Sequence, residues 1–196
     1  FAYGPAQGMP DDQVMDLEGL ARVKRDWMPG DGMLTLGISS RNIGAMSVGG
    51  AARGTLTIDM AKKDWGGARA LGLPITVHTS GPSPIKQLEE AGLLGPDLQL
   101  VHPLLTTPEE RAILKARGVS YSTSPTGEAR RPSKLGVVQL GELLHDGVKV
   151  SLSTDHTTNY NCDPFVAMRI LLVLHQHRIG SMPLSVKRLV QLATLD

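Results

Sequence analysis

The chain has 196 residues, enough for one domain with a sizeable hydrophobic core. Its net charge of +1 and its aromatic content of 4 % argue against binding of nucleic acid or of an anionic membrane surface. The single cysteine, Cys162, excludes an internal disulfide framework and favours a reducing, cytoplasmic location.

The chain contains no transmembrane pattern and no signal-peptide pattern. It has no run of eighteen uninterrupted apolar residues, which a membrane-spanning helix would need. The first residues, "FAYGPAQGMPDDQ", lack an initiator methionine and the basic and apolar regions of a signal peptide. We therefore expect the sequence to begin within a longer protein.

Short apolar runs alternate with helical patterns along the chain. The runs typical of strands are residues 33–39, 74–79, 98–102, 119–124 and 148–154. Apolar residues at helical spacing predict helices over residues 57–72, 83–95, 107–118, 136–147, 163–178 and 183–195. This alternation predicts an α/β fold with parallel strands, right-handed crossovers and flanking helices, in a single domain over residues 1–196.

Helix 107–118 carries the clearest boundary signals. Thr107 is suited to cap its first turn, Pro108 fits its first position, and Gly118 can end it in a left-handed conformation. Helix 163–178 has a similar start, with Asp163 as its expected cap.

Residues capable of chemistry fall at equivalent places, where predicted strands end. His78 ends one strand, His102 the next, Thr123 and Ser124 the third, and Asp155 follows the fourth. The carboxyl ends of parallel strands gather on one face, where active sites of such folds lie. Two imidazoles and a carboxylate suit Zn²⁺ or Fe²⁺, so the pattern predicts a metal-dependent hydrolytic barrel. Alternatively, each histidine could make a loop hydrogen bond and Asp155 could serve a turn.

The other histidines and the cysteine carry weaker signals. His156 is adjacent to that aspartate, so it either lines the site or points away from it. Three further histidines, His145, His175 and His177, are expected on solvated helix surfaces. Cys162 has no oriented base beside it in the sequence, which argues against a nucleophile.

Four segments together resemble the amidohydrolase superfamily, and within it the cytosine deaminase and triazine hydrolase branch. They are "ARALGLPITVHTSG", "LQLVHPLLTTPEERAILKARGVSYSTSP", "KLGVVQLGELLHDGVKVSLSTDHTTNYNCDPFVAMRILLVLHQ" and "PLSVKRLVQLAT". The resemblance runs from about residue 55 to the end, with the motifs in the family's order and at its intervals. It implies a partial (β/α)₈ barrel of the TIM type, in which the five predicted strands are about the fourth to the eighth.

The resemblance also implies roles for individual residues. His78 matches the fifth-strand metal ligand, and Asp155 matches the eighth-strand aspartate that binds metal and accepts a proton from water. His102 matches the sixth-strand histidine, which contacts the activated water or the substrate. Glu128 lies where some relatives have a glutamate that could help to bind substrate, and His156 is a further candidate for substrate binding.

These roles imply a hydrolase that acts on a C–N or C–Cl bond of a small heterocycle. No lysine ends the strand at residues 33–39, where two-metal members often carry a carboxylated lysine, so one divalent metal is expected, Zn²⁺ or alternatively Fe²⁺. The cation would lower the pKa of water toward about 7, Asp155 would accept its proton, and His102 would stabilise charge on the substrate.

Three features depart from the family pattern. No His-x-His pair precedes His78; the only such spacing, His175 and His177, falls inside a predicted helix. Gly81 stands where deaminases of this group usually carry a glutamate, and the chain ends just after "LAT", before the segment that completes the barrel. We therefore expect a fragment that lacks two metal ligands and associates, either with the missing part of the chain or as a homo-oligomer.

Two alternatives to this enzyme stay open at the sequence level. One is a non-catalytic or truncated scaffold of the same fold that packs with a partner chain, which the departures favour. The other is a phosphate-binding barrel, which would need a glycine-rich loop that "DHTTNYN" does not offer.

Overall fold

The computed structural model describes residues 2–4, 13–26, 35–43, 46–48, 51–53, 56–79, 83–129, 138–155, 162–177 and 183–194. The chain divides into two compact units, an N-terminal unit of residues 1–99 and a C-terminal unit of residues 100–196. Two compact units can belong to one domain or to two, so the single domain over residues 1–196 stays a prediction. No helix in the described part of the chain has the length and apolar character needed to cross a membrane.

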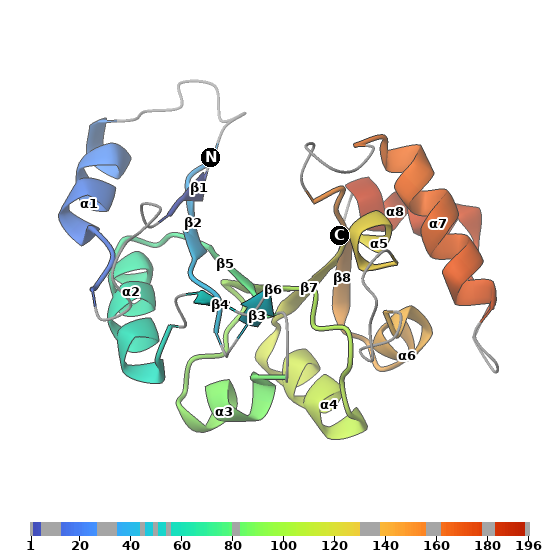
Figure 1. The fold of residues 1–196 in the computed structure, drawn as a ribbon, viewed down its shortest axis with the longest axis horizontal. Coiled ribbons are helices and arrows are strands. Elements are labelled where there is room, and N and C mark those ends of the chain that lie inside the picture. Colours follow the sequence, from blue (N-terminus) through green and yellow to red (C-terminus); the bar gives the residue numbers. More distant parts are fainter. Residues whose placement is uncertain are drawn as a thin grey trace. The chain divides into compact units, whose positions relative to one another are not determined.

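The N-terminal unit is built on parallel strands. Strand β2 (Gly37–Ser40) pairs in parallel with β1 (Ala2–Tyr3) on one side and with β5 (Ile75–His78) on the other. A short antiparallel hairpin and three helices complete its described elements: β3 (Met46–Val48), β4 (Ala51–Arg53), α1 (Leu17–Asp26), α2 (Ile58–Ala70) and α3 (Ile85–Glu90). Figure 1 shows these elements in blue to green.

The C-terminal unit repeats the same construction. Strands β7 (Ser120–Thr123) and β8 (Lys149–Leu152) run side by side in parallel, with Tyr121 opposite Val150 (Figure 1). Strand β6 (Leu98–Val101) lies at the boundary of the two units along the chain. The helices of this unit are α4 (Pro108–Arg117), α5 (Pro125–Glu128), α6 (Leu140–His145), α7 (Pro164–Gln176) and α8 (Val186–Thr194).

The predicted α/β fold with parallel strands and flanking helices is confirmed. Each of the five predicted strands and six predicted helices has a counterpart, although α3 and α6 are shorter than predicted. The structure also contains elements that the sequence does not predict: β1, the β3–β4 hairpin, α1 and the single turn of α5. The missed strands and α5 are two to four residues long, which is too short for periodicity to reveal.

Capping interactions fix where several helices begin and end. Thr107 Oγ1 accepts a hydrogen bond from the Glu110 amide at 3.2 Å, and Glu110 Oε2 accepts one from the Thr107 amide at 2.8 Å. Gly118 closes α4 at a φ of 69°, as the sequence predicts. The predicted Asp163 cap of α7 is also confirmed, since Asp163 Oδ1 accepts from the Phe165 amide at 2.8 Å.

Each unit has its own buried core behind its strands. In the N-terminal unit the fully buried Trp65 of α2 donates its indole N–H to Ser40 Oγ at 2.9 Å, at the end of β2. In the C-terminal unit Tyr121 and Val150 of the two paired strands are fully buried beneath the helices. This packing fixes the strands and therefore the residues that follow their carboxyl ends.

Candidate functional site

The candidate site of the C-terminal unit lies where strands β6, β7 and β8 end. His102 directly follows β6, Thr123 is the last residue of β7, and Asp155 comes three residues after Leu152, the end of β8. Backbone hydrogen bonds hold these ends together: the His102 amide donates to Ser122 O at 3.0 Å, and the Ser153 amide donates to Thr123 O at 2.8 Å. Parallel pairing thus brings residues more than fifty positions apart to one place.

His102 and Asp155 form the centre of this group. His102 is 2 % exposed, and its Nε2 lies 3.7 Å from Asp155 Oδ2. This separation exceeds a hydrogen bond. It is close to the roughly 3.4 Å that separates two ligand atoms of one tetrahedral Zn²⁺ with bonds of about 2.1 Å. An imidazole nitrogen and a carboxylate oxygen at this spacing fit a shared divalent cation.

The other ring nitrogen of His102 is held by Glu128. His102 Nδ1 lies 2.9 Å from Glu128 Oε1, and both side chains are almost completely buried. The Ser124 amide donates to the same Oε1 at 2.8 Å, and Thr123 Oγ1 donates to Oε2 at 2.6 Å. Both Glu128 oxygens therefore accept hydrogen bonds from groups of the protein. The predicted role of Glu128 in substrate binding stays a prediction.

Helix α5 explains how Glu128 reaches His102. The Glu128 amide donates to Ser124 O at 2.9 Å, so the chain makes one helical turn directly after β7. This turn directs the carboxylate back over the end of the strand that carries Thr123. Burial raises the pKa of the Tyr121 hydroxyl well above its usual value, and the negative charge of Glu128 raises it further.

The backbone is strained at the two central residues. Among the residues that the structure describes, His102 (φ 60°) and Asp155 (φ 63°) are the non-glycine residues with positive φ. The left-handed conformation costs an L-amino acid roughly 1–2 kcal/mol. Such strain tends to be retained at functional sites, where the surrounding structure holds it in place. Here Ser153 Oγ accepts from the Asp155 amide at 3.0 Å and helps to hold the turn.

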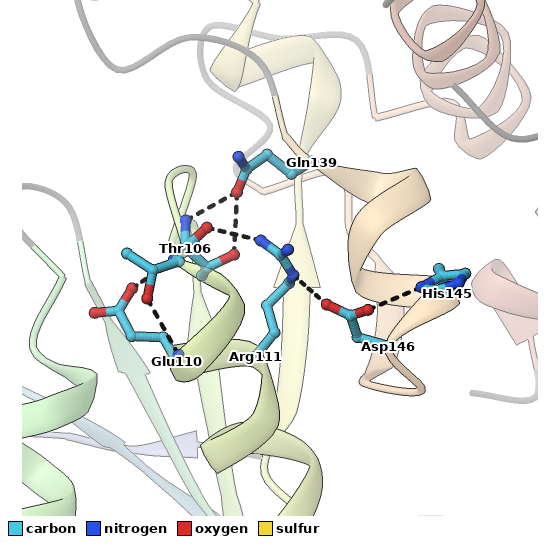
Figure 2. A network of polar contacts seen from close by, with 7 residues as sticks. Thr106, Glu110, Arg111, Gln139, His145 and Asp146 are labelled. Atoms are coloured by element: carbon cyan, nitrogen blue, oxygen red, sulfur yellow. Dashed lines mark hydrogen bonds and ion pairs between the residues drawn. The ribbon is translucent and has the colours of Figure 1, made fainter. Parts of the chain in front are cut away.

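A polar network braces the segment that follows His102 (Figure 2). The amide and hydroxyl of Thr106 donate to Gln139 Oε1 at 2.9 and 3.1 Å, and Arg111 Nη1 donates to Thr106 O at 2.8 Å. Arg111 Nε then donates to Asp146 Oδ2 at 2.5 Å, and His145 Nδ1 lies 2.9 Å from Asp146 Oδ1. The network connects the segment after β6 to α4 and to the end of α6.

Two further predicted site residues are His78 and His156. His78 ends β5 in the N-terminal unit and is half-buried, and its role as a metal ligand stays a prediction. His156 and Gly81 lie outside the described residues.

The expected surface positions of the other histidines are confirmed in two cases and wrong in one. His145 and His177 are exposed, as predicted, and Cys162 lies exposed in a loop. His175 is 3 % exposed, so its predicted solvated position is wrong. Its spacing explains the error: His175 stands four residues after Leu171 and eight after Ala167, on the buried face of α7.

No family model matches the chain. Among curated proteins, the chain is 30 % identical over 138 residues to a 5-methylthioadenosine/S-adenosylhomocysteine deaminase of Thermococcus sibiricus, a match that covers 63 % of this chain and 32 % of that protein. It is 33 % identical over 97 residues to a 5'-deoxyadenosine deaminase of Methanopyrus kandleri, covering 49 % of this chain and 22 % of that protein. The matches thus span a third or less of these curated relatives.

Solved structures match almost the whole chain. A zinc-bound adenosine deaminase from Xanthomonas campestris matches with a TM-score of 0.74 and 19 % identity, over 90 % of this chain and 40 % of that one. A zinc complex of atrazine chlorohydrolase from Arthrobacter aurescens matches with a TM-score of 0.75 and 15 % identity, over 97 % of this chain and 44 % of that one. These similarities match an assignment of the chain to the amidohydrolase superfamily. The predicted partial TIM-like barrel is confirmed.

Proposed function

We propose that this chain is part of a metal-dependent hydrolase of the amidohydrolase type that cleaves a C–N bond, or a C–Cl bond, of a small heterocyclic substrate. The named relatives are deaminases, and the matched structures include a chlorohydrolase. Both reactions replace a leaving group on carbon by water, so one arrangement of base and charge-stabilising groups can serve either.

The observation that carries this proposal is the pair of the buried His102 and the partly exposed Asp155, with Nε2 and Oδ2 3.7 Å apart. A carboxylate beside an imidazole supplies a proton acceptor and a hydrogen-bonding group within reach of one reacting atom. Asp155 accepts the proton of the attacking water, and the lone pair of His102 Nε2 stabilises charge that develops on the substrate by accepting a hydrogen bond from one of its N–H groups. A divalent cation bound here, Zn²⁺ or alternatively Fe²⁺, supplies the lowered pKa of water that hydrolysis near neutral pH requires.

We further propose that His78 binds the same cation together with Asp155. His78 ends strand β5 and His102 directly follows strand β6, so both histidines stand at the carboxyl ends of parallel strands. His102 and His156 are proposed to contact the substrate.

Metal titration and a substrate screen test the proposal. Isothermal titration with Zn²⁺ should give about one equivalent per chain for the wild type and none for Asp155→Ala. The full-length protein should release ammonia or chloride from at least one member of a panel of aminopyrimidines, aminopurine nucleosides and triazines. Asp155→Asn should lower that rate by about 10²–10⁴-fold, the usual worth of a positioned proton acceptor.

Asp163→Asn is the matched control for the aspartate substitution. Asp163 is exposed and caps α7, and asparagine caps equally well, so zinc stoichiometry and rate should stay unchanged. If the full-length protein turns over nothing in the panel, or if Asp155→Asn retains full rate, the hydrolase proposal is wrong.

A second candidate is a non-catalytic scaffold of the same fold that associates with a partner chain or with a second copy. Gly81, at the position where the deaminases that this chain resembles usually carry a glutamate, favours it. A folded chain that binds no Zn²⁺ at millimolar concentration, and that sediments as a concentration-dependent oligomer, would support this candidate over the enzyme.

A further inference from the structure

We propose that Glu128 is a positioning residue for His102: it keeps the imidazole hydrogen on Nδ1 and so presents Nε2 toward Asp155. The inference rests on the proposed function only for what Nε2 does in a reaction. The geometry that supports it lies entirely within the C-terminal unit.

The direction of the hydrogen bond follows from the third partner. Glu128 Oε1 lies 2.8 Å from the Ser124 amide, and an amide N–H can only donate. A carboxylate has no hydrogen to donate, so Oε1 accepts from both partners, and His102 Nδ1, 2.9 Å from the same oxygen, carries the hydrogen between them. If the hydrogen stood on Nε2 instead, two lone pairs would face each other at 2.9 Å in a buried place, which is costly.

Glu128 is itself held rigidly. Thr123 Oγ1 donates to its second oxygen at 2.6 Å, and the residue is 3 % exposed. The single turn of α5 ties its backbone to Ser124. Since both carboxylate oxygens and the backbone are fixed, the carboxylate can fix the ring of His102 in turn.

The consequence appears at the other side of the ring. With Nδ1 engaged, Nε2 is the nitrogen 3.7 Å from Asp155 Oδ2, and its orientation no longer depends on what binds between them. Histidines of metal sites commonly donate their second ring N–H to a carboxylate, and loss of that partner costs roughly 10–100-fold in metal affinity or activity. Glu128 occupies this position relative to His102. It acts through His102 and does not need to touch a substrate.

The test uses ¹⁵N chemical shifts of the histidine side chains in the whole chain, without added metal, because these shifts report which ring nitrogen carries the hydrogen. His102→Asn identifies the His102 signals. Wild type should show the hydrogen on Nδ1. Glu128→Gln keeps an acceptor oxygen and should retain this form, whereas Glu128→Met has none and should shift His102 toward the form with the hydrogen on Nε2.

Glu110→Gln is the matched control, since it also removes a buried carboxylate of the C-terminal unit that accepts a hydrogen bond from a backbone amide. This variant should leave the His102 chemical shifts unchanged. If Glu128→Met does not fold, the wild-type spectrum still decides. A hydrogen on Nε2 in the wild type, or unchanged His102 shifts in folded Glu128→Met, overturns the inference.

A zinc titration and a rate measurement on the same variants separate this inference from the proposed function. Because His102 contacts the substrate in the proposed function, Glu128→Met should lower the hydrolytic rate of the full-length protein about 10–100-fold while it binds Zn²⁺ as the wild type does, and Glu110→Gln should change neither. An unchanged rate in folded Glu128→Met counts against the positioning role. If the wild type binds no Zn²⁺ but carries the hydrogen on Nδ1, the proposed function fails while the positioning of His102 stands.

Discussion

His102 and Asp155 hold their side chains with a backbone conformation that most residues avoid. Their φ angles of 60° and 63° place both in the left-handed region, where glycine is free of the steric cost. A protein under selection for stability alone would favour glycine at such positions. Asp and His adopt this conformation more readily than most other non-glycine residues, and their presence at these two positions fits the proposed role of an imidazole and a carboxylate.

This strain leads to a prediction about Asp155. Asp155→Gly should be more stable than Asp155→Ala by about 1 kcal/mol, because glycine relieves the left-handed conformation and alanine does not. Urea unfolding midpoints measure the difference. The neighbouring Thr154, whose φ is not positive, gives the control: there the glycine variant should be the less stable of the two. Equal or reversed stabilities at Asp155 would show that its backbone is not strained.

At this scale the sequence predicts positions better than interactions. His102 and Asp155 could be chosen because both follow predicted parallel strands, and strand phase is readable from the sequence. The partnership of Glu128 with His102 could not be predicted, because it depends on a single turn after β7 that has no periodicity of its own. The position of His175 differs from its prediction for a different reason: residue type predicts exposure for a histidine, whereas its helical spacing places it on the apolar face of α7.

Helix α4 begins with a reciprocal pair of hydrogen bonds between Thr107 and Glu110. Thr107→Ala should cost about 1 kcal/mol of unfolding free energy, the usual worth of such a cap. Glu110→Ala removes the other half of the same pair, so the double variant should cost less than the sum of the single ones. Chemical denaturation of the four proteins gives the coupling. Strict additivity would mean that the two bonds act independently.

The network of Figure 2 predicts how stability depends on pH. The hydrogen bond from Arg111, and then that from His145, hold the pKa of Asp146 below its ordinary value of 3.8. A carboxylate whose folded pKa is depressed stabilises the fold above its unfolded pKa, and this stabilisation disappears as pH falls through the folded pKa. The difference in unfolding free energy between wild type and Asp146→Asn should therefore be full at pH 6 and should shrink below about pH 4.

Arg111→Leu provides the control for this pH effect. Since Arg111 is the main cause of the lowered pKa, the pH dependence of Asp146→Asn should be smaller in the Arg111→Leu background. Urea unfolding at half-unit pH steps measures both comparisons. If Asp146→Asn still lowers the unfolding free energy at pH 2 as much as at pH 6, the stabilisation does not come from the ionised Asp146 carboxylate.

Helices were predicted well where their ends carry chemical signals. Thr107, Gly118 and Asp163 mark boundaries that the structure reproduces, because a cap is a local interaction between neighbouring residues. The ends of α3 and α6 carry no side-chain cap, and their predicted lengths were too great. Pairing of short strands such as β1 with β2 depends on distant residues and has no local signal.

At the scale of the whole molecule, the repeated order of strand and helix was enough to predict a parallel α/β fold, and family motifs were enough to place it in a barrel. Solved structures match 90 % or more of this chain but less than half of their own length. A complete metal site draws ligands from several strands of a barrel. The fold could thus be inferred from this part of a barrel, whereas activity depends on residues that one part of a barrel need not contain.

The strength of metal binding should be visible in the stability of the whole chain. A ligand that binds the folded state alone raises the unfolding free energy by RT ln(1 + [L]/Kd), which is about 2.7 kcal/mol at 100 times Kd. For a chain of this size that corresponds to an increase in Tm of roughly 5–10 °C. The increase should grow with the logarithm of Zn²⁺ concentration in thermal scans, and Asp155→Asn should abolish it, because a cation that stabilises the fold through this site needs the Asp155 carboxylate. A rise in Tm that Asp155→Asn retains would mean that Zn²⁺ acts at another place. A wild-type Tm that stays constant up to millimolar Zn²⁺ would leave the proposed ligands His78 and Asp155 without a metal-binding role in this chain.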